Sequence, residues 1–307
     1  MAITNEKSTQ PLFTYDVNAL RSKLGQCIQR NLSSDTWSWL NEKASLITSN
    51  ESPQHFMLAF AAVPRKTGKQ PIALADVEAL EIQHIRSGLF IKNWSVDRLC
   101  RVWLLLHLDA SDQERYVGTI EKLFPTAEMS EQVTLYSALP VLAFPERWRH
   151  RCTEGIRSNI ADVLTSIMCN NPYPSENLGE PAWNQLVLKA IFTEKPIDQI
   201  IGLDERANKI LASTLSDYAH ERWAAHRTVY PLLWRCVGKF IDDKIFPDIE
   251  RIANSPEEPE RIAAVLSSKD STYKPAHELI GKSPVLRDIA NSGVTWRDLA
   301  KKLEGNS

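Results

Sequence analysis

Apolar side chains recur every three or four residues along most of the chain, the spacing that places them on one face of an α-helix. Val17 to Arg30 shows this pattern directly after Asp16, a residue type that commonly caps a helix N-terminus. Further segments with the same spacing follow, many of them opened by Ser or Pro. No convincing alternation of period two, the mark of a half-buried strand, interrupts them. The pattern predicts an all-α protein.

The predicted helices are mostly one to two dozen residues long and are joined by short links. This organisation predicts antiparallel helix pairs, stacked either as an irregular HEAT-like α-solenoid or as an irregular bundle. Both arrangements stay open, because the sequence shows no clean repeat period. We expect three parts: a flexible N-terminal arm at 1–14, an N-terminal helical region at 15–175 and a C-terminal helical region at 176–307.

One polar residue interrupts an apolar stripe in the C-terminal region. Asn184 falls in the middle of the face that Val187, Leu188 and Ile191 form. A buried amide without a partner costs roughly 1–3 kcal/mol, so we expect a fixed partner for Asn184. That partner is either a neighbouring loop or helix end, or a bound ligand.

The helix expected from Glu205 to Ala225 carries charge on its apolar face in the same way. Arg222 is expected near the centre of that face, with Asp217 and Glu221 at its edge. Two acidic residues one turn apart are tolerated where a cation lies between them. The set predicts either a buried ion-pair network that fixes packing or a polar pocket for an anionic or hydroxylated ligand.

Asp204 is expected to cap this helix, and Arg206 is a second cation that could lie between the acidic residues. The candidate ligand- or partner-binding residues are therefore Asn184, Asp204, Arg206, Asp217, His220, Glu221 and Arg222.

His220 followed by Glu221 resembles the start of a zinc protease motif. That motif needs a second histidine four residues after the first, but position 224 is Ala, and His226 lies on another side of the helix. Two ligands without a third make a weak zinc site. We expect no metal and no cofactor, and we assign no catalytic residue.

The charge balance bears on the partners. The 307 residues include 36 Lys and Arg against 38 Asp and Glu, a formal net charge of -2. This balance argues against nucleic acid or an anionic membrane as the main partner, because both favour a basic patch.

The cysteines and the apolar runs indicate the cellular compartment of the protein. The five cysteines are odd in number and scattered, with no CxxC pair, which fits a reducing compartment. The N-terminus has no apolar run typical of a secretory signal, and the longest apolar runs are too short to span a bilayer. We expect a cytoplasmic protein without a transmembrane segment.

Five segments carry a resemblance to a known family. They are LYSALPVL (Leu135–Leu142), NPYP (Asn171–Pro174), AWNQLVLKAIF (Ala182–Phe192), GLDERAN (Gly202–Asn208) and DYAHERWAAHR (Asp217–Arg227). From Val133 onward the chain resembles the EboA family, whereas the first half matches loosely. The family belongs to a bacterial gene cluster implicated in moving secondary-metabolite precursors towards the periplasm.

The resemblance implies a non-enzymatic adaptor or binding protein that supports traffic of such a precursor from the cytoplasm towards the periplasm. It implies a small metabolite and other products of the ebo cluster as partners, which look like a membrane prenyltransferase and a sugar-phosphate cyclase. The family supplies no catalytic residues to carry over. The alternative is an enzyme of the same pathway with a polar helical pocket. That pocket would be formed by Asn184, Asp217, His220, Glu221 and Arg222.

Overall fold

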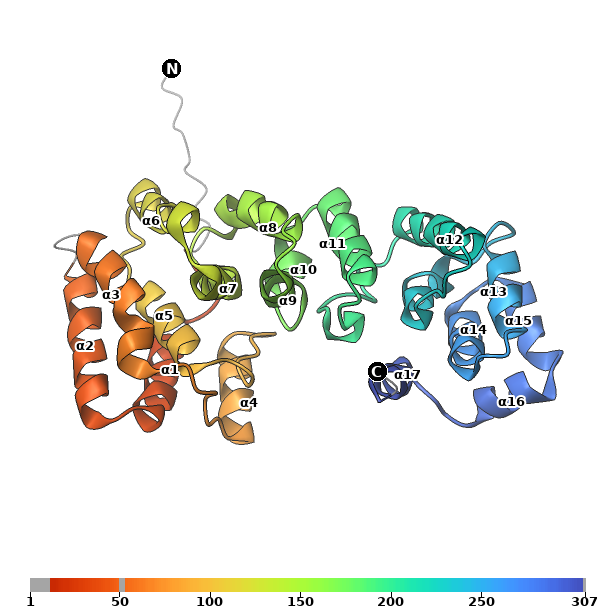
Figure 1. Ribbon diagram of the computed structural model, residues 1–307, viewed down its shortest axis with the longest axis horizontal. Helices are drawn as coiled ribbons and strands as arrows, with labels where there is room; N and C mark the ends of the chain where they lie inside the picture. Colours follow the sequence, from red (N-terminus) through yellow and green to blue (C-terminus); the bar gives the residue numbers. More distant parts are fainter. Residues whose placement is uncertain (1–11, 50–52, 306–307) are drawn as a thin grey trace, which may run out of the picture. The chain divides into compact units, whose positions relative to one another are not determined.

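The computed structural model describes residues 12–49 and 53–305, and most of these residues lie in helices. The described part of the chain contains no β-strand, and its extended backbone pairs at a single isolated bridge between Pro71 and Ser95. The all-α prediction is confirmed (Figure 1). Residues 1–11 of the expected N-terminal arm lie outside the described residues. Whether the helix pairs stack as a solenoid or as a bundle stays a prediction.

The chain divides into two compact units, Met1–Leu178 and Gly179–Ser307. The helices of the first unit are α1 (Val17–Asn31), α2 (Ser34–Thr48), α3 (Pro53–Thr67), α4 (Asp76–Ile85), α5 (Val96–Leu105), α6 (Gln113–Glu121), α7 (Met129–Ala138), α8 (Arg149–Ile156), α9 (Ala161–Met168) and α10 (Tyr173–Asn177). Two 3₁₀ segments, η2 (Leu139–Val141) and η3 (Pro145–Trp148), lie between α7 and α8.

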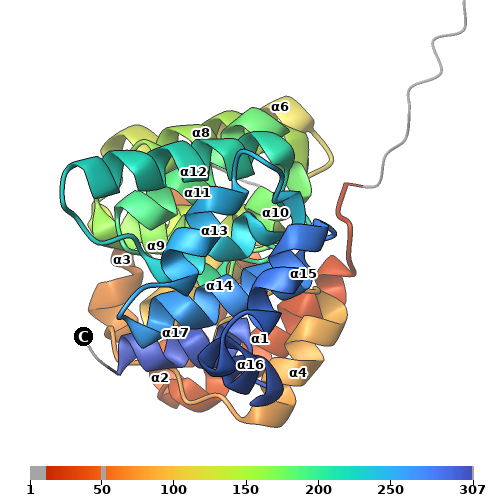
Figure 2. The ribbon, with the colours of Figure 1, turned by 90° about the vertical axis from the view of Figure 1, so that its right-hand side faces the viewer.

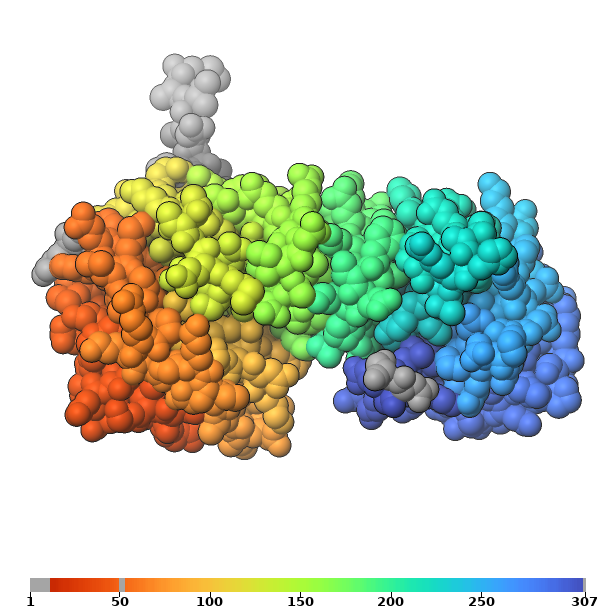
Figure 3. Space-filling model, viewed as in Figure 1, coloured from red at the N-terminus to blue at the C-terminus, as the bar shows by residue number. Residues whose placement is uncertain are grey.

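Helix α5 lies at the centre of this unit. It packs against α1, α3 and α7, and all but one of its residues are buried. Burial on nearly every side means that neighbouring helices cover most of α5, and that its charged residues Asp97 and Arg101 need partners inside the protein. On the face that Figure 3 shows, side chains of the first unit close over the spaces between the ribbons.

The sequence PRKTGKQP at 64–71 predicts a basic, solvated loop, but α3 continues into its first half. The helix runs through Pro64 to Thr67 and ends at Gly68, whose φ of 76° is a backbone conformation that glycine adopts readily. Proline has no amide hydrogen, so Pro64 leaves the carbonyl of Phe60, four residues earlier, without its helical donor. Arg101 of α5 replaces that donor, because its Nε lies 2.9 Å from the Phe60 carbonyl oxygen.

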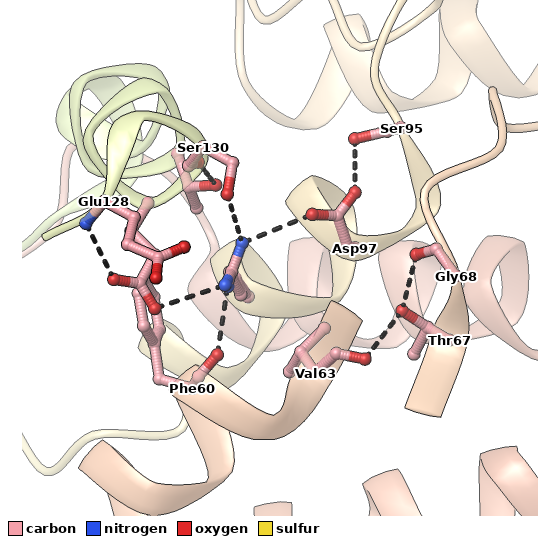
Figure 4. Close-up of polar contacts among 11 residues, drawn as sticks. Phe60, Val63, Thr67, Gly68, Ser95, Asp97, Glu128 and Ser130 are labelled. Atoms are coloured by element: carbon pink, nitrogen blue, oxygen red, sulfur yellow. Dashed lines mark hydrogen bonds and ion pairs between the residues drawn. The ribbon is translucent and has the colours of Figure 1, made fainter. Parts of the chain in front are cut away.

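Arg101 is also the centre of a buried ion-pair cluster, and Figure 4 labels its neighbours Asp97 and Ser130. The side chain is 2% exposed, and its two terminal nitrogens lie 3.2 Å from Asp97 Oδ2 and 3.2 Å from Glu131 Oε1. Asp97 accepts a second hydrogen bond, from Ser95 Oγ at 2.5 Å, and Ser130 Oγ lies 3.4 Å from Arg101. The cluster therefore joins α3, α5 and α7 through one guanidinium.

We predict that Arg101→Ala lowers the free energy of unfolding by about 3–5 kcal/mol, because it leaves Asp97 buried without its cation. Arg147→Ala is the matched control. Arg147 pairs with the exposed Glu114 at 2.6 Å, and solvent screens such a pair so that its loss should change stability little. Pro64→Ala added to Arg101→Ala should recover about 1 kcal/mol, because the alanine amide can donate to the Phe60 carbonyl. Urea denaturation followed by circular dichroism measures all three, and similar losses for the two arginine variants would contradict the prediction.

A half-buried titratable group, His107, follows α5. His107 Nδ1 lies 3.1 Å from Thr48 Oγ1, and its ring centroid lies 4.4 Å from that of Trp103. Burial, assisted by the charge of Arg21, lowers the pKa of His107 from an ordinary value near 6.5 to about 4. The folded protein therefore holds this imidazole neutral at neutral pH.

We predict that the free energy of unfolding falls as the pH drops from about 6.5 to about 4. In that window the unfolded chain binds a proton at His107 that the folded chain does not. After allowance for partial solvent exposure, the effect is about 1–2 kcal/mol. His107→Gln should flatten this part of the pH profile in urea titrations at pH 7, 5.5 and 4.5. An unchanged slope in the variant would show that other groups cause it.

The second unit contains α11 (Glu180–Phe192), α12 (Lys209–Ala224), α13 (Phe246–Ala253), α14 (Glu258–Asp270), α15 (Lys274–Gly281), α16 (Pro284–Asn291) and α17 (Trp296–Glu304). Helix α14 contacts α13, α15, α16, α17 and the 3₁₀ segment η5 (Pro231–Cys236), as Figure 2 shows from the side of this unit. It is the central helix of the second unit.

Two expected boundaries in this unit are wrong. Pro231 and the apolar residues through Phe240 predict one helix that begins at Tyr230, but these residues form η5 and η6 (Gly238–Phe240). The sequence also predicts a loop at 267–275, but α14 continues to Asp270. A Cβ on Gly238 would lie 2.9 Å from the Ser267 carbonyl oxygen, so glycine permits the close approach of η6 to α14. Ser267 is fully buried there, and its Oγ donates to the Trp234 carbonyl at 3.1 Å. Tight packing of these two segments thus decides both boundaries.

Candidate functional site

The structure gives Asn184 a fixed partner within the protein. Asn184, on α11, is 8% exposed, and its carboxamide exchanges two hydrogen bonds with Asn208, at 3.2 and 2.8 Å. Asn208 Oδ1 also accepts from the Leu211 amide at 2.9 Å and so caps α12. Of the two expectations for Asn184, the geometry matches a side chain that holds a neighbouring helix end.

The expected start of α12 at Glu205, with Asp204 as its cap, is wrong. The helix begins at Lys209, and Asp204 instead forms a two-pronged ion pair with Arg235, at 2.7 and 2.6 Å. The guanidinium of Arg206 lies over the ring of Trp183, 4.6 Å from its centroid. Asp204 and Arg206 therefore do not point towards a common site with the acidic residues of α12.

The expected charged face of α12 is wrong as well. Its buried face consists of Leu211, Ala212, Leu215, Ser216 and Ala219, so Asp217 and Glu221 lie exposed on other sides. Arg222 is half-buried in the last turn, and its Nε donates to the Thr228 carbonyl at 2.9 Å. The chain turns back at His226, whose φ is 55°, and this brings Thr228 within reach. A backbone carbonyl thus accepts from Arg222 at the position where the sequence predicted carboxylate partners.

His220 has a partner that the sequence did not indicate. Asp248, on α13, is 4% exposed and accepts hydrogen bonds from Ser216 Oγ at 2.6 Å and from His220 Nε2 at 2.6 Å. The carboxylate lies between the serine and the histidine, whereas an activated serine must donate to the histidine itself. The arrangement orients His220 and ties α12 to α13, but it does not build a serine nucleophile.

The described residues 12–49 and 53–305 contain no group of three or more His, Cys, Asp or Glu side chains that could hold a metal ion. The five cysteines are free and buried. Burial raises the pKa of Cys100 and Cys152, and that of Cys236 to about 12, so these three thiols stay protonated at neutral pH. In the same described part of the chain, no helix combines the length and the apolar character needed to cross a membrane.

The first unit contains a cavity of about 360 Å³ next to the end of α4, η2 and α10. Its lining residues are Thr14, Arg86, Leu139, Pro140, Leu142, Pro145, Tyr173, Glu176 and Asn177. The volume falls within the range of small-molecule sites, roughly 300–1,000 Å³. Two of the segments that carry the family resemblance, Leu135–Leu142 and Asn171–Pro174, supply part of the wall.

Hydrogen bonds to backbone carbonyls hold the cavity wall in place. Asn171 Nδ2 donates to the Tyr136 carbonyl at 3.1 Å and to the Ser166 carbonyl at 2.9 Å. Asn171 Oδ1 accepts from the Tyr173 amide at 3.0 Å, which fixes the start of α10. The Tyr173 hydroxyl donates to the Pro145 carbonyl at 2.5 Å, and burial raises the pKa of Tyr173, so this hydroxyl stays a neutral donor.

Arg86 is the buried cation of this wall. It is 6% exposed, and its guanidinium forms a fork with the carboxylate of Glu176, at 2.9 and 2.5 Å. The Tyr15 ring lies 5.9 Å from the guanidinium, and the Tyr15 hydroxyl donates to the Val141 carbonyl at 2.6 Å. The expected candidates omitted this site, because its residues come from four stretches that no sequence period connects. The visible signals were the two segments of the family resemblance that reach the wall, Leu135–Leu142 and Asn171–Pro174.

We predict that Asn208→Ala lowers the free energy of unfolding by about 2–4 kcal/mol. The change removes the cap of α12 and leaves the buried Asn184 amide without its partner. Arg222→Ala removes one hydrogen bond of a half-buried group and should cost about 1 kcal/mol or less. Thermal and urea unfolding of both variants provides the comparison. A larger loss for Arg222→Ala would restore the buried ion-pair network expected from the sequence.

The chain matches the model of a known protein family over most of its length. The family model described as metabolite traffic protein EboA matches residues 20–238, from α1 into the first residue of η6. No curated protein and no solved structure matches the chain. The matched range holds the whole cavity lining except Thr14, and it holds the Asn184–Asn208 pair. The chain belongs to the EboA family of metabolite traffic proteins.

Proposed function

We propose that the protein is a non-enzymatic binding protein that holds a small secondary-metabolite precursor and supports its traffic from the cytoplasm towards the periplasm. The observation that carries this proposal is the cavity of about 360 Å³ in the first unit. Its wall combines apolar side chains, such as Leu139 and Leu142, with a few polar groups, which is the usual composition of a ligand pocket.

The polar groups of α11 and of the segment that precedes α12 support a binding role more than a catalytic one. Asn184 bonds Asn208, and Asp204 pairs with Arg235. A general acid or base must reach the proton that it transfers, and a group held by another protein group in this way fixes helix packing instead. None of these four residues lines the cavity.

The second candidate function is an enzyme of the same pathway. The contact of 2.6 Å between His220 and the buried Asp248 favours it, because a carboxylate that orients a histidine can assist proton transfer. The side chain of His220 is 54% exposed, so a substrate could reach it. His220→Gln separates the candidates: under the binding proposal metabolite traffic continues in this variant, whereas the enzyme would lose its product.

Other products of the ebo cluster, the prenyltransferase-like and cyclase-like proteins, are the partners in this proposal. The cytoplasm is its starting compartment. The free, buried cysteines support that choice, because thiols persist in reducing compartments.

We predict that protein purified from its own host carries a small molecule, visible by native mass spectrometry as a mass above that of the chain. Thr14→Trp should lower the occupied fraction by about tenfold or more, because an indole at this exposed lining position fills part of the cavity and removes more than about 1.4 kcal/mol of binding.

Thr165→Trp is the matched control, since Thr165 is an exposed residue of α9 that does not line this cavity. Equal occupancy in both variants would place the ligand elsewhere. An empty wild-type protein from the intact host would contradict the binding function.

A further inference from the structure

The position of the Arg86 guanidinium does not depend on its carboxylate partner. Its Nε donates to the Pro140 carbonyl at 2.9 Å, and its Nη1 donates to the Ser87 carbonyl at 2.9 Å. The side chain is 7% exposed. Two carbonyl groups therefore fix the guanidinium plane, but neutral carbonyls do not balance its charge.

The carboxylate of Glu176 balances the charge of Arg86, but fewer contacts hold Glu176 in place than hold the guanidinium. Its side chain is 41% exposed, and it lies on α10, which is only five residues long. Within the described residues, Arg86 is the one side chain that donates to the Glu176 carboxylate. If Glu176 rotated into water, Arg86 would thus be the one buried group among the described residues that lost its partner.

A carboxylate from a ligand can restore that missing partner. Arg86 and Glu176 both line the cavity, beside the apolar residues Leu139, Pro140 and Leu142. An arginine fork recognises any planar carboxylate by two parallel hydrogen bonds. Exchange of one carboxylate for another leaves the buried charge balanced, and the displaced Glu176 is hydrated because it already lies half in solvent.

We propose that Glu176 occupies the place of a ligand carboxylate on Arg86, and that the cavity takes metabolites that carry a carboxylate on an apolar or aromatic body. This inference rests on the proposed binding function and adds the chemical class of the ligand. The alternative is that the pair serves the fold alone and holds the end of α4 to α10. In that case no ligand displaces Glu176.

The test uses two probes of equal shape, 3-phenylpropanoate and its neutral amide, with the full chain and isothermal titration calorimetry. The wild-type protein should bind the carboxylate at least about tenfold more tightly than the amide, a difference of about 1.4 kcal/mol. Glu176→Gln removes the internal competitor, so affinity for the carboxylate should rise by about tenfold while affinity for the amide changes less than about twofold. Glu258→Gln, an exposed partner of Lys302 in the second unit, should change neither value.

Glu176→Asp covers the case in which the glutamine variant does not fold. The shorter side chain weakens the fork without removing the charge, so affinity for the carboxylate should again rise. Equal affinity of the wild-type protein for both probes, or unchanged carboxylate affinity in every Glu176 variant, would overturn the inference. So would the absence of binding by either probe.

These outcomes are separable from those of the binding proposal. A neutral metabolite that co-purifies from the host and is lost in Thr14→Trp would keep the binding function and overturn the carboxylate inference. A co-purified carboxylic acid that Glu176→Gln retains more tightly would support both.

Discussion

The carbonyl group of Phe60 loses its helical donor because Pro64 lies inside α3, and the guanidinium of Arg101 replaces that donor. Burial of an arginine is costly unless its charge and its hydrogen bonds are satisfied together. Asp97 and Glu131 supply the charge, and the Phe60 carbonyl and Ser130 supply further acceptors. One side chain thereby fixes α3, α5 and α7 against each other. Since α7 leads directly into η2, the same cluster also sets the position of the Pro140 carbonyl that holds Arg86.

The two buried arginines of the first unit differ in what surrounds their carboxylates. The side chains of Asp97 and Glu131 are 3% and 15% exposed, so neither can leave Arg101 without becoming an unpaired buried charge. The carboxylate of Glu176 is close to water already, and its departure leaves only Arg86 to be satisfied. The first cluster is therefore a fixed element of the fold, whereas the second can exchange its partner. Solvent exposure of the anion, and not the strength of the fork, separates the two.

Much of the helical order follows from local rules. The spacing of apolar residues predicted the α class, and Asp16 caps α1 as expected. Asn184 needed a partner because of where it falls on its helix, and Asn208 is that partner. The segment from Gly202 to Asn208 contains two residues of the kind that cap helices, Asp204 and Asn208. The chain uses the second, because Arg235, far along the chain, already takes the first. Such a choice depends on a tertiary contact, which helix periodicity does not contain.

The error at Arg222 has a related cause. A helical wheel gives direction around the axis but not whether a neighbouring helix covers that part of the axis. Arg222 lies in the last turn of α12, where the returning chain at Thr228 meets it in place of another helix. The cavity was even harder to predict from the sequence. Its lining residues, Thr14, Arg86, Pro140 and Tyr173 among them, meet only after α4, η2 and α10 have packed.

The five segments that carry the family resemblance have two different structural roles. Ala182–Phe192 and Gly202–Asn208, in the second unit, meet through the Asn184–Asn208 amide pair, and Asp217–Arg227 is tied to α13 by the Asp248 carboxylate. These contacts give Asn184, Asn208 and His220 partners within the protein. Leu135–Leu142 and Asn171–Pro174 behave differently, because their buried hydrogen bonds shape a wall and leave a space of about 360 Å³ beside it. The same hydrogen bonds hold the lining residues in fixed positions beside this partly open space. A preformed wall of this kind suits the binding role proposed for the cavity.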